Sequence, residues 1–171
     1  MGGASELVVA DSDGANERTL ATRSLPSNFL SFAGRGTPSG QGTVIRPAWS
    51  PDGRTLALIG FAPVAGMRTR QAVFVDVATG KELSVPIRDG GSADGIEWLD
   101  AGHLLISHIG PKDAASQLWV LSHPSGAWSR LTNDLGNYAS FSLSADRQSV
   151  AVARWDHRVG ISMLEGASRR A

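Results

Sequence analysis

The stretch that decides the fold is PAWSPDGRTLAL, residues 47–58. Its second proline presets one backbone angle and its glycine accepts a positive φ, so Asp52-Gly53 suits a tight turn between two antiparallel strands. The apolar alternation resumes in AVFVDV, residues 72–77, and a further turn follows at Thr79-Gly80. We therefore expect a four-stranded antiparallel unit over residues 46–86.

The same arrangement recurs twice further along the chain. The second copy reads GIEWLDAGHLLI at residues 95–106 and QLWVL at 117–121, and the third reads SLSADRQSVAV at 142–152 and ISMLEG at 161–166. Trp49 and Trp98 are 49 residues apart, and the turn glycines Gly80 and Gly126 are 46 apart. A period of about 45 residues with four short strands per repeat is typical of a β-propeller blade.

The repeat predicts an all-β fold, with essentially no helix, in which residues 1–171 form a single partial propeller of about three to three and a half blades. A closed propeller has roughly four to eight blades, so this length is short for a ring. The predicted parts are a half blade at 5–22, a long surface loop at 23–45, blades at 46–86 and 94–132, and a partial blade at 138–168.

Alignment of the repeats carries two structural expectations. Arg147 stands where Gly53 stands in the first repeat, so either this turn differs or an arginine is held at a positive φ that few non-glycine residues adopt. The large apolar side chains at alternating strand positions are expected to be buried between sheets; they are Trp49, Phe74, Trp98 and Trp119.

Composition excludes several classes of protein. The chain has 16 basic and 16 acidic side chains, no Cys, and 42% hydrophobic residues. A zero net charge gives no overall attraction to nucleic acid, the missing Cys excludes a disulfide-stapled scaffold, and no apolar run is long enough to insert into a membrane. We expect a soluble protein, and both the cytoplasm and the periplasm stay open as its compartment.

The sequence offers no motif for catalysis, a cofactor or a metal. The four His residues are scattered, and the calcium-like segment 11–17 has its Gly at the fourth position instead of the sixth. Residues 90–94, GGSAD, lack the final Gly of a nucleophile elbow. The candidate interaction surface combines aromatic and basic side chains; it consists of Trp128, Tyr138, Trp155, Arg154 and Arg158.

The units resemble the TolB-like β-propeller repeat, a relative of the WD repeat, through PAWSPDGR at residues 47–54 and DVATG at 76–80. The second and third units depart from this pattern in the turn of their first hairpin. RLTNDLGNY, at 130–138, resembles propellers appended to bacterial eukaryotic-like serine/threonine kinases. The resemblance implies a platform for protein interaction or sensing, and no kinase motif is present to carry a kinase activity over.

We therefore expect a non-catalytic module that binds a protein or peptide, either as part of a larger bacterial regulatory protein or in a self-associating propeller. Because an open arc exposes apolar faces and strand edges, a second copy of the chain that completes the propeller is one expected partner. Two alternatives are the propeller portion of a prolyl-oligopeptidase-type hydrolase and a ligand-sensing domain of a kinase.

Overall fold

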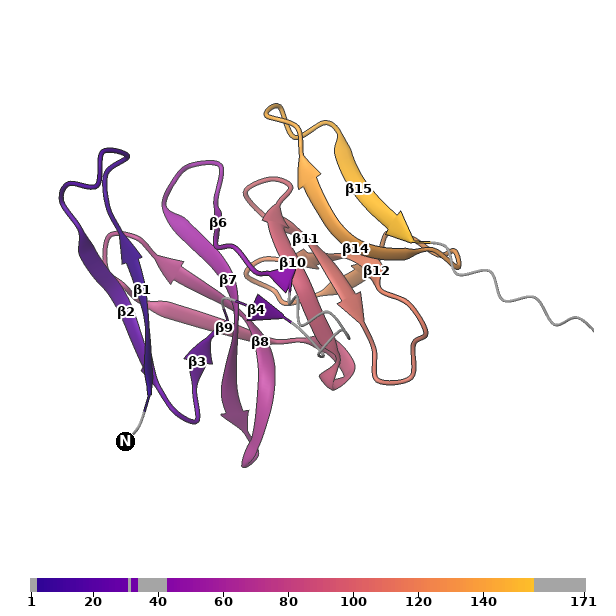
Figure 1. Cartoon of the computed structure of the whole chain (residues 1–171), viewed down its shortest axis with the longest axis horizontal. Helices are drawn as coiled ribbons and strands as arrows, with labels where there is room; N and C mark the ends of the chain where they lie inside the picture. Colours follow the sequence, from indigo (N-terminus) through magenta and orange to yellow (C-terminus); the bar gives the residue numbers. More distant parts are fainter. Residues whose placement is uncertain (1–2, 31, 34–42, 156–171) are drawn as a thin grey trace, which may run out of the picture.

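The structure is a computed structural model of the chain, and it describes residues 3–30, 32–33 and 43–155. Antiparallel β-sheets stand side by side along the molecule (Figure 1). The described part contains no α-helix, only the 3-10 turn η1 (Arg88–Gly90), and no helix in it is long and apolar enough to cross a membrane. The prediction of an all-β, partial propeller is confirmed.

Two inner sheets form complete blades, each with four strands that follow one another in the sequence, and the sheet of blade 1 also contains a fifth, short strand, β3 (Asn28–Phe29). Blade 1 contains β6 (Ala48–Trp49), β7 (Thr55–Val64), β8 (Met67–Asp76) and β9 (Glu82–Pro86). Blade 2 contains β10 (Ser92–Trp98), β11 (His103–Ile109), β12 (Gln117–Ser122) and β13 (Trp128–Arg130).

A two-stranded sheet stands at each end of the row. The N-terminal sheet pairs β1 (Ala4–Val9) with β2 (Arg18–Ser24), and the C-terminal sheet pairs β14 (Asn137–Leu143) with β15 (Val150–Trp155). The strand expected at residues 161–164 lies outside the described residues.

The turn of the first hairpin in blade 1 is repeated in the C-terminal sheet. The Ser50 amide donates to the Thr55 carbonyl at 2.8 Å, and the Ser144 amide donates to the Ser149 carbonyl at 2.9 Å. In both turns the serine hydroxyl accepts a hydrogen bond from the amide that closes the turn, at 2.9 and 3.0 Å. The degenerate third repeat therefore builds the same turn.

Arg147 occupies the place of Gly53 in this shared turn. The φ angles are 69° at Gly53 and 59° at Arg147, and the amide of each donates to the carbonyl of the turn serine at 2.9 Å. Of the two alternatives open from the sequence, the structure shows the second: the turn is kept, and arginine adopts the left-handed conformation that glycine adopts more easily.

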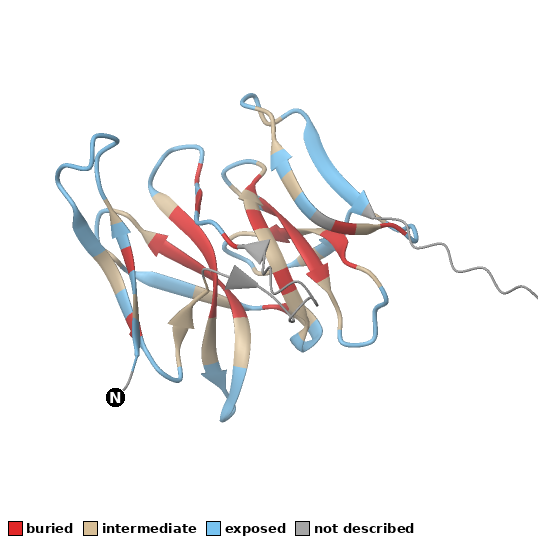
Figure 2. Ribbon diagram, viewed as in Figure 1, coloured by how far each residue is buried: buried red, intermediate tan, exposed pale blue. Residues whose placement is uncertain are grey.

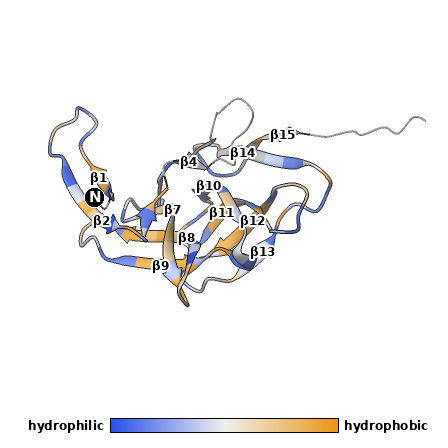
Figure 3. Ribbon diagram, turned by 60° about the horizontal axis from the view of Figure 1, so that its bottom comes forward, coloured by the Kyte–Doolittle hydropathy of each residue, from blue (hydrophilic) through white to orange (hydrophobic). Residues whose placement is uncertain are grey.

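Both faces of blade 1 are buried, because successive side chains of a strand point to opposite faces. One face packs on blade 2 and the other on the N-terminal sheet (Figure 2). The first face carries Ala57, Ile59, Ala72 and Phe74, and the second carries Leu56, Leu58, Val73 and Val75. Hydrophobic residues are accordingly concentrated along the central strands (Figure 3). Each fully buried Leu, Ile, Val or Phe contributes about 1.5–3 kcal/mol.

Trp49 contradicts the expected burial, although Phe74 and Trp98 confirm it. Trp49 is 49% exposed, whereas Trp98, at the matching position of blade 2, is 1% exposed. The cause is the neighbouring sheet: Trp98 faces the complete blade 1 and donates from Nε1 to the Ala48 carbonyl at 3.1 Å. Trp49 lies opposite Leu56, on the face covered by the two-stranded N-terminal sheet. Trp119 is half-buried.

The described residues within 23–45, which the sequence assigns to a surface loop, include short strands. The short strand β3 (Asn28–Phe29) pairs with β7, and β4 (Phe32–Ala33) pairs with β5 (Thr43–Val44). Gly60 makes the first pairing possible, since a Cβ there would lie 2.8 Å from the Asn28 carbonyl oxygen. Turn-forming composition concealed these two-residue strands from sequence analysis.

Arg23 connects the N-terminal sheet to blade 1. Its side chain is 8% exposed and its Nη2 lies 2.6 Å from the Glu82 carboxylate. The guanidinium also donates to the Phe61 carbonyl and the Ser84 hydroxyl, at 3.3 and 3.0 Å. A buried arginine needs such partners, because an unpaired buried charge is strongly destabilising.

Candidate functional site

The aspartates at the hairpin turns form hydrogen bonds within those turns. Asp52 accepts hydrogen bonds from the Ser50 hydroxyl and the Arg54 amide, at 2.7 and 3.0 Å. Asp146 accepts the equivalent bond from the Ser144 hydroxyl at 2.5 Å. These serine hydroxyls are the main cause of the lowered pKa of both carboxyls. Each carboxylate is therefore held ionised within its own turn.

The described histidines are also structural. His103 Nδ1 lies 2.9 Å from the Asp100 carboxylate in the turn of blade 2. Burial lowers the pKa of His108 and of His123, and the His123 ring lies 4.2 Å from that of Phe74, centroid to centroid. Within the described ranges, no three His, Cys, Asp or Glu side chains are grouped to hold a metal ion.

Of the candidate surface residues, the three whose side chains the structure describes do not lie together on one exposed patch. Tyr138 is 7% exposed, with its hydroxyl donating to Asp134 at 2.7 Å, because β14 turns this ring toward blade 2. Trp128 packs against the core and lies 6.0 Å from the His108 ring. Arg154 is half-exposed and 3.7 Å from Asp134. The Trp155 side chain and Arg158 lie outside what the structure describes.

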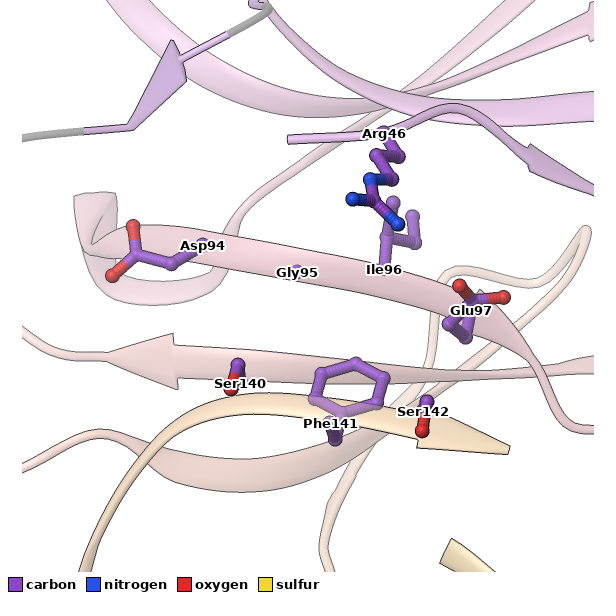
Figure 4. Close-up of a pocket in the computed structure, with 8 residues that line it drawn as sticks. All are labelled: Arg46, Asp94, Gly95, Ile96, Glu97, Ser140, Phe141 and Ser142. Carbon is purple, nitrogen blue, oxygen red and sulfur yellow. The ribbon is translucent and has the colours of Figure 1, made fainter. Parts of the chain in front are cut away.

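A groove runs instead between β10 and β14, the first strands of two neighbouring sheets. Its first hollow, of about 360 Å³, is lined by Arg46, residues 94–97 of β10 and residues 140–142 of β14 (Figure 4). A second hollow, of about 250 Å³, continues along residues 142–145 to Arg147. Glu97 and Ser142 line both hollows, so we treat them as one feature, the β10–β14 groove.

The groove lies along strand edges. Successive side chains of a strand point to opposite faces, so a hollow lined by four consecutive residues of β10 follows the edge of that strand. Among the described strands, β10 pairs only with β11 and β14 only with β15. Each therefore has one edge on which no described strand lies, and such an edge can accept another chain. Some backbone groups of these strands are already hydrogen-bonded: the Trp98 carbonyl accepts from Arg147, and the Tyr138 amide and carbonyl bond to Ser116 and Ser107.

Glu97 lies where the two hollows of the groove meet and is one of the charged residues that line it. Burial raises the pKa of the Glu97 carboxyl, and the nearby charges of Arg147 and Arg46 only partly offset this. No hydrogen bond from a described residue stabilises the carboxylate. Asp94, at the other end, is 3.7 Å from Arg70. Glu97 is thus the acceptor in the groove that a ligand donor would satisfy best.

Gly95 shapes the floor of the groove. A Cβ at this position would lie 3.0 Å from the ring of Phe141, so glycine lets the aromatic ring pack directly over β10. The ring supplies an apolar contact between the polar groups of Glu97 and Ser140 (Figure 4).

Sequence analysis missed this groove, although one signal was present. The strand registers make Ala48, Glu97 and Ser142 equivalent, each one residue before the large apolar residue of its repeat. Ala48 is 3% exposed, so a glutamate in the next repeat is a charge at a position that blade 1 buries. Nothing in the sequence showed that β10 and β14 leave a hollow there.

Three solved structures are similar to this chain. TolB from Acinetobacter baumannii is 20% identical over 86% of this chain and 42% of its own, with a TM-score of 0.49. A protein assigned as TolB from Agrobacterium tumefaciens is 16% identical over 90% and 47%, with a TM-score of 0.58. Hydrazine synthase from Kuenenia stuttgartiensis is 16% identical over 85% and 48%, with a TM-score of 0.49.

The chain spans less than half the length of each of these proteins. No family model matches it. The similarity to the Agrobacterium structure, together with the repeated four-stranded blades, establishes the fold. This chain is a partial β-propeller of the TolB-like fold.

Proposed function

We propose that this chain is a non-catalytic propeller segment that binds an extended segment of a partner protein in the β10–β14 groove. The observation that carries the proposal is the run of consecutive residues, 94–97, that lines the first hollow. Such an edge binds an extended peptide as an added strand, with main-chain hydrogen bonds giving affinity and side-chain pockets giving specificity.

The dimensions of the groove suit this ligand. Residues 140–145 of β14 and its turn follow it from end to end. Residues 140–143 are the extended part and span roughly 13 Å, which matches about four residues of an extended peptide, whereas Ser144 and Ala145 belong to the turn. Phe141 offers an apolar contact, while Glu97 offers an acceptor for a ligand amide or amine.

The groups in the groove favour binding over catalysis. Ser140 and Ser142 are the hydroxyls of the first hollow, and no described histidine lines either hollow to act as their base. A serine nucleophile requires an adjacent base within hydrogen-bond reach. This supports a ligand-binding role and gives no support to hydrolysis by the segment itself.

The test selects heptapeptides from a phage-displayed random library on the purified 171-residue chain and measures their affinity by calorimetry. Ser142→Trp, on an exposed position that lines both hollows, fills the groove. Ser129→Trp, on an exposed position of β13, is the matched control. We expect at least about a tenfold loss of affinity, about 1.4 kcal/mol, for Ser142→Trp and none for the control. Failure to select any peptide, or equal binding by both variants, would contradict the proposal.

A further inference from the structure

The two end sheets are complementary halves of a blade. The C-terminal sheet has the turn that joins the first two strands of blade 1, as shown above. The N-terminal sheet has a glycine turn related to the one that joins the last two, but one residue tighter. Gly14 and Gly80 have φ angles of 85° and 70°, and their amides donate to the carbonyls of Asp11, three residues earlier, and Asp76, four residues earlier, at 2.9 and 2.8 Å. The molecule therefore has strands one and two at one end and strands three and four at the other.

Exposed valines stand at positions that the complete blade buries. The turn registers place Val150 and Val152 of β15 at the positions of Leu56 and Leu58, which are 2% and 3% exposed in β7. The same two valines are 38% and 41% exposed. Apolar side chains in such positions are typical of a surface that another element covers.

The N-terminal sheet shows the same mismatch. Counting back from the turn aspartates Asp11 and Asp76, Val8 of β1 takes the position of Val73 in β8, and this match places Leu7, like Ala72, on the face toward the next blade along the chain. Val73 is fully buried, whereas Val8 is 41% exposed. On its other face β1 is packed, through Leu7, against blade 1. The exposed valines of β1 and β15 thus belong to one face of an incomplete blade.

The register of blade 1 also predicts how the two halves meet. In blade 1, β7 pairs with β8 so that Leu58 lies opposite Val73 and Gly60 lies opposite Gln71. Transferred to the end sheets, this register places Val152 opposite Val8 and Arg154 opposite Glu6. An apolar pair and a pair of opposite charges directly across two strands are both stabilising. The edges are therefore complementary in hydrogen bonding, in hydrophobicity and in charge.

The two edges lie at opposite ends of the row of sheets (Figure 1). Among the described strands, β1 pairs only with β2 and β15 only with β14. A strand that covers β15 in this register must therefore come from outside the described part of the same chain or from another molecule.

We propose that two copies of this chain associate about a two-fold axis, with β15 of each copy pairing with β1 of the other to complete a four-stranded blade at both junctions. Two blades and one completed blade per chain give a ring of about six blades, within the range of closed propellers. A closed two-fold arrangement leaves no exposed β1 or β15 edge. This inference does not depend on peptide binding in the β10–β14 groove.

The experiment measures the mass of the full chain in solution by sedimentation equilibrium at tens of micromolar. The expected mass is twice the 17.9 kDa of one chain. Glu6→Arg and Arg154→Glu each place like charges across both junctions, and each should weaken the dimer by at least about tenfold. Glu17→Arg, an exposed position outside the junction, is the control of equal charge change and should leave the mass unchanged.

Mixing the two weakened variants is the decisive step. In a mixed dimer of Glu6→Arg with Arg154→Glu, both junctions join opposite charges again, so the dimer should reappear on mixing. Because the two proteins are folded before mixing, a folding defect does not produce this result. A monomeric wild-type chain, larger open-ended assemblies, or a mixture that stays monomeric would each overturn the proposal. A monomer is also the outcome expected if residues 156–171 cover β15 within the same chain.

Discussion

Arg147 in the turn of the C-terminal sheet donates from Nη1 to the Trp98 carbonyl oxygen of blade 2 at 2.6 Å. The same residue holds a φ of 59°. A charge-assisted hydrogen bond between sheets thus accompanies a backbone conformation that is unfavourable for arginine. The side chain joins two neighbouring sheets at the end of the β10–β14 groove.

Substitution of Arg147 separates these two effects. Arg147→Ala removes the hydrogen bond and keeps the strain, so we expect it to destabilise the fold by about 1–2 kcal/mol. Arg147→Gly also removes the bond but relieves the strain, and it should be more stable than Arg147→Ala by about 0.5–1 kcal/mol. Urea unfolding followed by circular dichroism measures both. An alanine variant as stable as the glycine variant would show that the turn is not strained.

Trp98 and Trp49 occupy equivalent repeat positions with opposite burial, so they should differ sharply in stability. Trp98→Ala leaves a large cavity between blades 1 and 2 and should cost about 3–5 kcal/mol. Trp49→Ala, at a side chain 49% exposed, should cost about 1 kcal/mol or less. Chemical denaturation followed by circular dichroism compares them. Equal losses would mean that another part of the chain covers Trp49.

Gly80 and Gly53 provide a matched pair at positive φ. The angles are 70° and 69°, but a Cβ on Gly80 would lie 2.3 Å from the Leu20 carbonyl oxygen, whereas a Cβ on Gly53 meets nothing within 4 Å. Gly53→Ala should therefore cost only the backbone strain, about 1 kcal/mol. Gly80→Ala should cost clearly more, because backbone must move. The midpoints of thermal unfolding test the order, and the reverse order would contradict the packing of β2 on this turn.

The pH dependence of stability should report the burial of Glu97. Its pKa is raised in the folded state, so its contribution is most favourable below the unfolded-state pKa and is lost as the pH rises through the folded-state pKa. Glu97→Gln has no ionisable carboxyl at this position, so the variant does not lose this stability as the pH rises. The free energy of unfolding of the variant, relative to wild type, should therefore increase between pH 4 and pH 7. A relative decrease over that interval would show that Arg46 and Arg147 outweigh the burial.

The fold was predictable because its turns are local. Asp52-Gly53 and Thr79-Gly80 predict hairpin turns from their own residue types, and the recurrence of such turns along the chain indicates the blade repeat. The exposure of a side chain, in contrast, depends on the neighbouring sheet. Trp49 and Trp98 occupy equivalent positions in the sequence repeat, and their exposure differs because the sheets packed beside them have different numbers of strands.

The groove was less predictable than the fold. Glu97 attracts notice only when its register with Ala48 is known, and the hollow beside it depends on the placement of β14. The hydrolase and kinase-sensor alternatives stay predictions, since both depend on a catalytic domain and not on these sheets.

Hydrogen exchange at β10 tests the proposed binding mode most directly. With a library-selected peptide bound, the edge amides of residues 94–97 should exchange at least about tenfold more slowly, because an added strand hydrogen-bonds to them. Amides of β13, at the outer edge of the same sheet, should be unchanged. Protection at β13 or elsewhere, with residues 94–97 unaffected, would contradict peptide binding in the β10–β14 groove.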